Sequence, residues 1–512
     1  MRSRFTLACL AALMGPTALS AQAPVEAPLS VIDWLDTQTS TPAALPQPTE
    51  PDVTSTATVP QVSVAPLDGA APRRVGLAPA NVTGLPDTLW SGSDGAELAR
   101  TIAAMPDLRQ PALQSLFYTL LLAESLPPAR NATAFDLARI DALYALGALD
   151  PALALLQQAG PDTSAAHTAR YMDMALLTGS EAAACATLRA KPHLSPGPAH
   201  EVFCAARAGD WDTAVLILGT GRALGLMDET TVAALERFLD PDLFEDTPPL
   251  AVPTTPDALM FRVFQAIGTP IPTRGWPVVY ANADLADTVG WKARIEAGER
   301  LARTGAVADN RLLGLYTHRQ PAASGGVWDR VSALQRFETA LDQRNVNAVA
   351  KTLPGAWRAL RSARLTAPFA SLFANDLAAL TLSGPSADIA FEVLLLSPQY
   401  ETAAQVFPQR ALDRPVLAAI ASGTVPQDLT GDGVPGAILA AFRDAAPDST
   451  IIAAAQSGDL GHAILRTLAL THAGGAGDVA QLRTGLTTLR ALGLEDVARR
   501  TALQVLLLED PV

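Results

Sequence analysis

The sequence predicts an all-α protein of stacked antiparallel helical hairpins, similar to an α-solenoid, preceded by a signal peptide and a disordered Pro-rich tether. The chain has 512 residues, of which 49% are hydrophobic but only 5% aromatic. Alanine and leucine, both strong helix formers, therefore dominate the apolar content. Strand-like runs of β-branched residues with a period of two are scarce. At several places a glycine ends one helical run and another run starts within a few residues.

The first residues have the pattern of an export signal. Arg2 and Arg4 precede a mostly apolar run, and small residues follow at positions 18–23, as signal peptidase requires. We expect a signal peptide over residues 1–20, with cleavage between residues 20 and 23. The apolar run is too short and too interrupted to span a membrane.

The composition also indicates a compartment. The high alanine, proline and arginine usage is typical of a GC-rich bacterial genome, so we expect export to the periplasm of a Gram-negative bacterium. We expect no transmembrane segment in the mature chain, because no later run approaches about 18 uninterrupted apolar residues. Cys9 follows a weak lipoprotein pattern, which leaves lipidation as an alternative.

Residues 21–88 are rich in Pro, Ala and Thr and keep no helical period, which predicts a disordered tether. A short motif at residues 30–35 interrupts it. Ser30 and Asp33 fit a helix start, and four apolar residues accompany them, namely Val31, Ile32, Trp34 and Leu35. We interpret these four as candidates for partner binding, on the body of the protein or in a partner's groove. A residual apolar patch in a disordered tail is the alternative.

The helical body divides into three regions by composition and periodicity. We expect an N-terminal helical-repeat array over 89–240, a less regular central helical region over 241–330, and a C-terminal array over 331–512. Proline and acidic residues crowd the start of the central region, as is typical of a boundary. Within the C-terminal array, helix breaks are expected at Pro354, Pro368 and Gly384.

Five glycines are each followed, five residues later, by an alanine: Gly147 and Ala152, Gly179 and Ala184, Gly209 and Ala214, Gly458 and Ala463, and Gly493 and Ala498. We expect each glycine to end a helix in the left-handed conformation and each alanine to let two helices approach closely. The turn Gly209-Asp210-Trp211 with Ala214 resembles the turn of tetratricopeptide repeats. The resemblance covers a few turns. It implies degenerate helical hairpins, each about as long as one tetratricopeptide repeat.

Two cysteines, Cys185 and Cys204, remain after the signal peptide. Each lies in a helical run, and the loop between the runs contains three prolines. The midpoint of the two positions falls inside that loop, so two antiparallel helices would place the cysteines opposite one another. We predict a disulfide, as suits an oxidising compartment. Two buried free cysteines are the alternative.

The charge argues against polyanionic partners. Without Arg2 and Arg4 the chain has 35 basic and 51 acidic residues, a net charge of −16. Nucleic-acid binding needs a concentrated basic surface, whereas the basic residues here are dispersed. We therefore expect no nucleic-acid partner.

No sequence motif predicts a reaction, so we assign no catalytic, cofactor-binding or metal residues. The six histidines have no metal-ligand spacing, and the glycine patterns of phosphate loops are missing. Asp428, Thr430 and Asp432 begin like a calcium loop, but Leu439 stands where a bidentate carboxylate is needed. We interpret that segment as a turn.

These observations favour a non-enzymatic scaffold for protein–protein or peptide interactions in the bacterial cell envelope, since solenoids offer long binding surfaces. A glycan-binding protein or glycan-acting enzyme of the envelope is the alternative. Its groove would lie near four central aromatic residues, Trp276, Tyr280, Trp291 and Trp328. Those four residues also fit the interpretation of core anchors between the arrays. The sequence does not predict the ligand or the oligomeric state.

Overall fold

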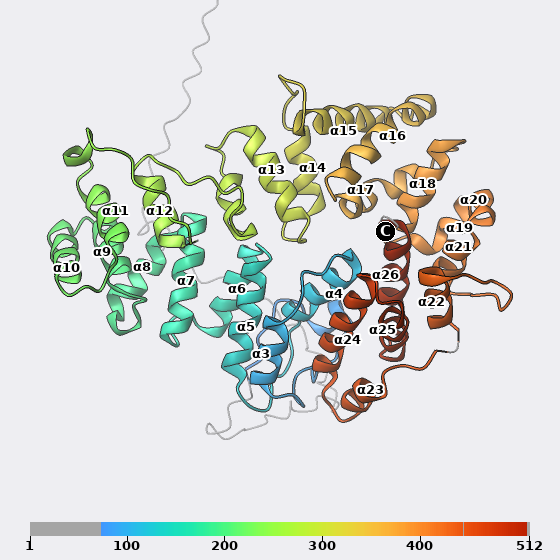
Figure 1. Ribbon diagram of the computed structural model, residues 1–512, viewed down its shortest axis with the longest axis horizontal. Coiled ribbons are helices and arrows are strands. Elements are labelled where there is room, and N and C mark those ends of the chain that lie inside the picture. Colours follow the sequence, from blue (N-terminus) through green and yellow to red (C-terminus); the bar gives the residue numbers. More distant parts are fainter. Residues whose placement is uncertain (1–72, 256, 444, 509–512) are drawn as a thin grey trace, which may run out of the picture. The chain divides into compact units, whose positions relative to one another are not determined.

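The computed structural model describes residues 73–508 except 256 and 444, and the described chain is all-α (Figure 1). Over those residues no β-strand forms, and three isolated bridges occur, all between residues 75 and 130. The predicted signal peptide and most of the predicted tether, including Val31, Ile32, Trp34 and Leu35, lie outside the described residues.

In the first half of the described chain, consecutive helices are joined by short turns and pack on one another. Their bounds are α2 (Ala80–Thr83), α3 (Gly95–Ala103), α4 (Pro111–Leu122), α5 (Ala132–Ala145), α6 (Leu149–Ala159), α7 (Ala165–Thr178), α8 (Glu181–Ala190), η1 (Pro192–Leu194), α9 (Pro198–Arg207), α10 (Trp211–Ala223), α11 (Glu229–Leu239) and η2 (Asp242–Phe244).

The centre is less regular, with a long 3₁₀ segment, and longer helices then resume. The bounds are α12 (Ala258–Ala266), η3 (Val278–Leu285), α13 (Trp291–Ala302), α14 (Asp309–Thr317), α15 (Val327–Asp342), α16 (Val346–Ser362), α17 (Thr366–Ala378), α18 (Pro385–Leu395), η4 (Tyr400–Thr402), α19 (Ala403–Val406), α20 (Pro408–Asp413), α21 (Pro415–Ser422), α22 (Gly433–Ala441), α23 (Ser449–Gln456), α24 (Leu460–Gly475), α25 (Val479–Ala491) and α26 (Glu495–Leu508).

The predicted turn glycines adopt the left-handed conformation. All five have positive φ, between 72° at Gly179 and 97° at Gly458. The alanine five residues after each glycine is 0% exposed, so a side chain larger than a methyl group would have to displace a neighbouring helix. These local predictions are confirmed.

The packed part of the chain begins earlier than the sequence predicts. Residues 75–85 were assigned to the tether, but Val75 and Leu85 are buried, and the backbone N–H of Leu77 donates to Leu122 O. Arg139 of α5, itself 1% exposed, donates to the carbonyl oxygens of Val75, Leu121 and Ala123. One buried guanidinium thus joins the backbone of the segment at Val75 to the C-terminal end of α4, which a proline-rich composition does not reveal.

Helix α16 does not break at Pro354, contrary to the prediction, because the proline lies inside it. A proline removes the hydrogen bond to the carbonyl four residues earlier, here Ala350. The Ser386 hydroxyl of α18 donates to that same oxygen at 2.8 Å. The neighbouring helix therefore supplies the hydrogen bond that the proline removes. The predicted break at Gly384 is confirmed, since α18 begins at Pro385.

The first and last long helices of the described chain pack together. Helix α24 contacts α3 and α4, and α26 contacts α4; in Figure 1 the blue and red ribbons are neighbours. At this terminal junction a Cβ on Gly461 would lie 2.2 Å from the Trp90 ring. Farther along it, the backbone N–H of Ala112 donates to Gln504 Oε1 at 2.8 Å.

Candidate functional site

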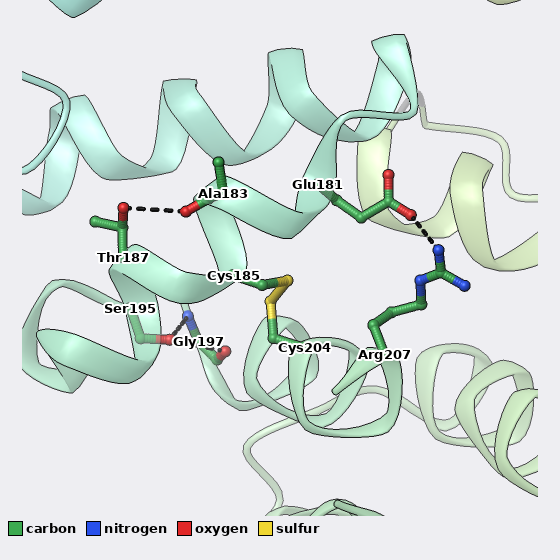
Figure 2. Close-up of a disulfide and its surroundings, with 8 residues drawn as sticks. All are labelled: Glu181, Ala183, Cys185, Thr187, Ser195, Gly197, Cys204 and Arg207. Carbon is green, nitrogen blue, oxygen red and sulfur yellow. Dashed lines mark hydrogen bonds and ion pairs between the residues drawn. A yellow bond between two sulfur atoms is a disulfide. The ribbon is translucent and has the colours of Figure 1, made fainter. Parts of the chain in front are cut away.

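The predicted disulfide is present between α8 and α9. Cys185 and Cys204 are bonded across a Cα–Cα distance of 5.2 Å, and both are buried. Figure 2 shows the cystine between the two helices, with Glu181 of α8 and Arg207 of α9 forming an ion pair at 3.2 Å beside it. The pair of helices is therefore held by a covalent bond and an ion pair, and it forms a firm support for α10, which packs on α9.

Helix α10 is covered on one side only. It starts at Trp211 because the Asp210 carboxylate accepts a hydrogen bond from the Thr213 backbone N–H. Ala214 and Leu218 are buried, and these face α9 and α11, the helices that α10 contacts.

Large apolar side chains are also exposed on α10 and in the turn after it. We call this the α10 surface; its members are Trp211 (50% exposed), Val215 (59%), Leu216 (69%), Leu224 (67%) and Leu226 (59%). Of the eleven exposed large hydrophobic residues in the described chain, these five and Leu243 lie between residues 211 and 243. Such clustering is typical of an interaction site, whereas scattered exposed apolar residues are ordinary.

The chain segment that contains the α10 surface is strongly acidic. Residues 210–246 contain nine acidic and two basic residues, a net charge of −7 against −14 for the whole chain. Glu236 is neutralised by Arg222 at 2.7 Å, and the other eight carboxylates are exposed. An apolar surface within an acidic segment favours a partner that carries both apolar and basic side chains.

The four central aromatic residues form two pairs. Trp276 and Tyr280 have ring centroids 4.8 Å apart and both pack on Phe261. Trp291 and Trp328 are 5.0 Å apart. All four rings pack against the core; Tyr280 is only 3% exposed. A glycan-binding groove near these four residues stays a prediction.

Tyr280 also belongs to a cluster of titratable groups between α7, α12 and η3. Burial, followed by the charge of Asp257, raises the pKa of Asp173 to about 7. Burial likewise raises the pKa of Tyr144 and Tyr280 and lowers that of His200. A carboxyl group that titrates near neutrality is typical of acid–base chemistry. Here burial by neighbouring helices is the leading cause of each shift, so we assign the cluster no catalytic role.

A second polar cluster has the connectivity of a catalytic triad. Asp459 Oδ2 lies 3.1 Å from His462 Nδ1, and His462 Nε2 lies 3.0 Å from Thr101 Oγ1. However, the Thr101 hydroxyl is also 3.1 Å from the Glu97 carbonyl of its own helix, and Ser93 donates to Asp459. These bonds join α3 to α24, so we interpret them as part of the terminal junction.

The sequence alone does not predict the α10 surface. The signal was present, because residues 214–218 read Ala-Val-Leu-Ile-Leu and make α10 apolar all around. Such a helix is expected to be buried on all sides. Only the packing reveals that one side has no cover.

Among the described residues, no three acidic, histidine or cysteine side chains are placed to hold a metal ion, and no helix is long and apolar enough to cross a membrane. Comparison of the chain with protein-family models, with curated proteins and with solved structures found no significant match.

Proposed function

We propose that this protein is an exported helical-repeat scaffold that binds a partner protein in the bacterial cell envelope through the α10 surface. The observation that carries the proposal is the cluster of exposed apolar side chains on a helix supported by a disulfide-linked pair. Several exposed large apolar side chains within one short segment are typical of an interaction site. The turn at Gly209 resembles the turn of tetratricopeptide repeats. If the hairpins stack as such repeats do, α10 would lie at one edge of the stack.

The occupant that we propose is a basic amphipathic helix of the partner. Its apolar side would cover Leu216 and Leu224, which are eight residues apart and so lie on one side of α10, and its basic residues would face the nearby acidic residues. Helices bind apolar surfaces through side chains at positions i, i+3, i+4 and i+7. The net charge of −7 over residues 210–246 supports a basic partner over an acidic one.

The test uses a defined probe. A fluorescently labelled 18-residue peptide, with Leu on one helical side and Lys on the other, is titrated with the purified protein and followed by anisotropy. We expect saturable binding that Leu216→Ser and Leu224→Ser each weaken about tenfold, because each removes an exposed apolar contact on the same side of α10. Raising the salt concentration should weaken binding further.

Leu412→Ser is the matched control, since Leu412 is 74% exposed against 69% for Leu216 and lies on α20. It should leave the affinity unchanged. A second peptide with Glu in place of Lys should bind much more weakly. Equal binding of both peptides, or equal loss in the control variant, would rule out the α10 surface as the basic-helix site.

Export and the N-terminal motif belong to the same proposal. We expect the mature N-terminus to lie between residues 21 and 24, as read by mass spectrometry of the periplasmic fraction; an uncleaved cytoplasmic chain would contradict this.

The motif residues Trp34 and Leu35 would offer a second contact to the partner. Changing both to Ala should lower partner recovery without altering the melting temperature.

A further inference from the structure

A second feature, independent of the α10 surface, is a pocket of about 500 Å³ beside α13. Its wall is formed by the segment before η3, by α13 and by Arg330 of α15. The volume lies within the range of about 300–1,000 Å³ that is usual for small-molecule sites.

The pocket is rich in arginine although the chain as a whole is acidic. Its lining includes Arg274, Arg300, Arg303 and Arg330, against Asp284, Glu296 and Glu299. The excess of one positive charge contrasts with the net charge of −14 for the chain.

The buried carboxylate of the pocket is already fully engaged. Glu299 is 2% exposed. Arg330 donates to both of its oxygens, at 2.9 and 2.7 Å, and the Tyr316 hydroxyl donates at 2.6 Å. Arg303 contributes a further, longer contact at 3.4 Å. Glu299 is therefore neutralised, and it holds two guanidinium groups in fixed positions.

Arg300 and Arg303 are also fixed by backbone oxygens. Arg300 donates to Thr273 O and Trp276 O, at 3.0 and 2.7 Å, and Arg303 Nε donates to Ala363 O at 2.7 Å. Within the described part of the chain, Nη1 of Arg303 has no hydrogen-bond partner. Fixed guanidinium donors lose little conformational entropy when they bind an anion.

The electrostatics point the same way. Burial lowers the pKa of Arg303, and the charge of Glu299 offsets this only in part. Burial also lowers the pKa of Arg300, against the opposing effect of Asp284. Both groups remain cationic at neutral pH. Their charges are thus partly desolvated and incompletely compensated, a situation that a bound anion improves.

We propose that this pocket binds a small organic molecule through one carboxylate, with Arg303 as the direct ligand and the pocket arginines as its cationic surroundings. A single excess positive charge matches a monoanion better than a phosphate dianion. Pro272, Ala293 and Ala297 supply small apolar walls for the body of the molecule. The free Nη1 of Arg303 would donate a charge-assisted hydrogen bond to the carboxylate.

The experiment is calorimetric titration of the purified chain with N-acetyl-alanyl-alanine, its C-terminal amide, and inorganic phosphate. We expect saturable one-to-one binding of the free acid, at least tenfold weaker binding of the amide, and weak or no binding of phosphate. Arg303→Gln should weaken binding of the acid at least tenfold. Arg303 also donates hydrogen bonds to Ala363 and Glu299. The melting temperature of the Arg303→Gln variant is therefore measured in parallel.

A second variant keeps the proposal testable if Arg303→Gln unfolds. Ala293→Leu fills the pocket without removing a charge and should abolish binding while α13 stays folded. Arg466→Gln, an exposed arginine on α24, is the control and should bind normally. No saturable binding of the acid, equal binding of acid and amide, preferred binding of phosphate, or normal binding by Ala293→Leu would each overturn the proposal. The α10 surface would be unaffected by any of these results.

Discussion

Asp173 illustrates how burial changes the chemistry of a single residue. Its carboxyl group lies near a second carboxyl group, Asp257, and between two tyrosines, and its pKa is raised to about 7. Arg170 opposes the shift but does not cancel it. At neutral pH this residue therefore holds its proton about half of the time, unlike an exposed aspartate.

This shift predicts how stability depends on pH. A folded-state pKa above the unfolded value stabilises the fold at low pH, and the stabilisation is lost as pH rises from about 4 to about 7. Asp173→Asn removes that loss and should therefore stabilise the protein at pH 8. The full pKa shift corresponds to ~4 kcal/mol. We expect about half of this, about 2 kcal/mol, because the buried amide of Asn also loses contact with water. At pH 4 the variant and the parent should be nearly equal.

Thermal unfolding at pH 4, 6 and 8 measures the effect. Asp376→Asn on α17 is a suitable control because Asp376 is exposed, and it should change the melting temperature little at any of these pH values. A stabilisation of Asp173→Asn that is independent of pH would show that the raised pKa is not its cause.

At the scale of elements, the pair α8–α9 and its disulfide are explained by local sequence. Each cysteine lies in a helix, as its helical run predicts, and the two meet because the connecting loop is centred between them. By contrast, the break that the sequence predicts at Pro354 is wrong. Helix α16 continues there because Ser386, from another helix, donates a hydrogen bond to the Ala350 carbonyl. Local signals predict turns and pairs well, whereas contacts between distant helices are invisible to them.

Removing the disulfide should destabilise the protein. The closed loop has a sequence separation of 19, for which the chain-entropy estimate is about 3 kcal/mol. Cys185→Ser with Cys204→Ser should therefore unfold at lower denaturant concentration, as measured by circular dichroism in guanidinium chloride. The parent protein treated with a reducing agent should behave like the double variant, while the variant itself should not respond to reduction. A response of the variant to reduction would contradict this account.

The α10 surface and the arginine pocket show the same limit of sequence reasoning. The sequence places Trp211 in a turn between helices. Its exposure depends on how α9 and α11 pack on α10, which the local sequence does not reveal. The pocket draws Thr273, Arg300 and Arg330 from separate segments, and no local spacing relates them. The aromatic residues that the sequence emphasised are bulky and therefore pack against the core.

At the scale of the whole described chain, the terminal junction is the feature that depends most on small side chains. A Cβ on Gly92 would lie 2.2 Å from the Gly458 carbonyl oxygen, and one on Gly461 equally close to the Trp90 ring. Backbone and ring can yield little, so the junction tolerates only glycine at both positions.

Gly461→Ala should accordingly destabilise the protein by about 2 kcal/mol or more, since overpacking costs 1–3 kcal/mol in well-packed sites. Gly314→Ala, at an exposed helical position where a Cβ meets no atom within 4 Å, should instead be neutral or slightly stabilising. Differential scanning calorimetry of both variants makes the comparison. Equal melting temperatures would mean that the junction adapts at no cost.

The terminal junction also sets an order of events during synthesis of the chain. Ser93 and Ala112 find their partners 366 and 392 residues later in the chain. Until the last hairpin has emerged, Trp90 and its neighbours lack the cover that they have in the finished fold. Contacts of such long sequence separation slow folding and leave apolar surface exposed in the meantime. A chain that emerges from its N-terminus onward would therefore keep the segment around Trp90 uncovered until nearly all of the chain has been made, which is when it would most need protection from aggregation.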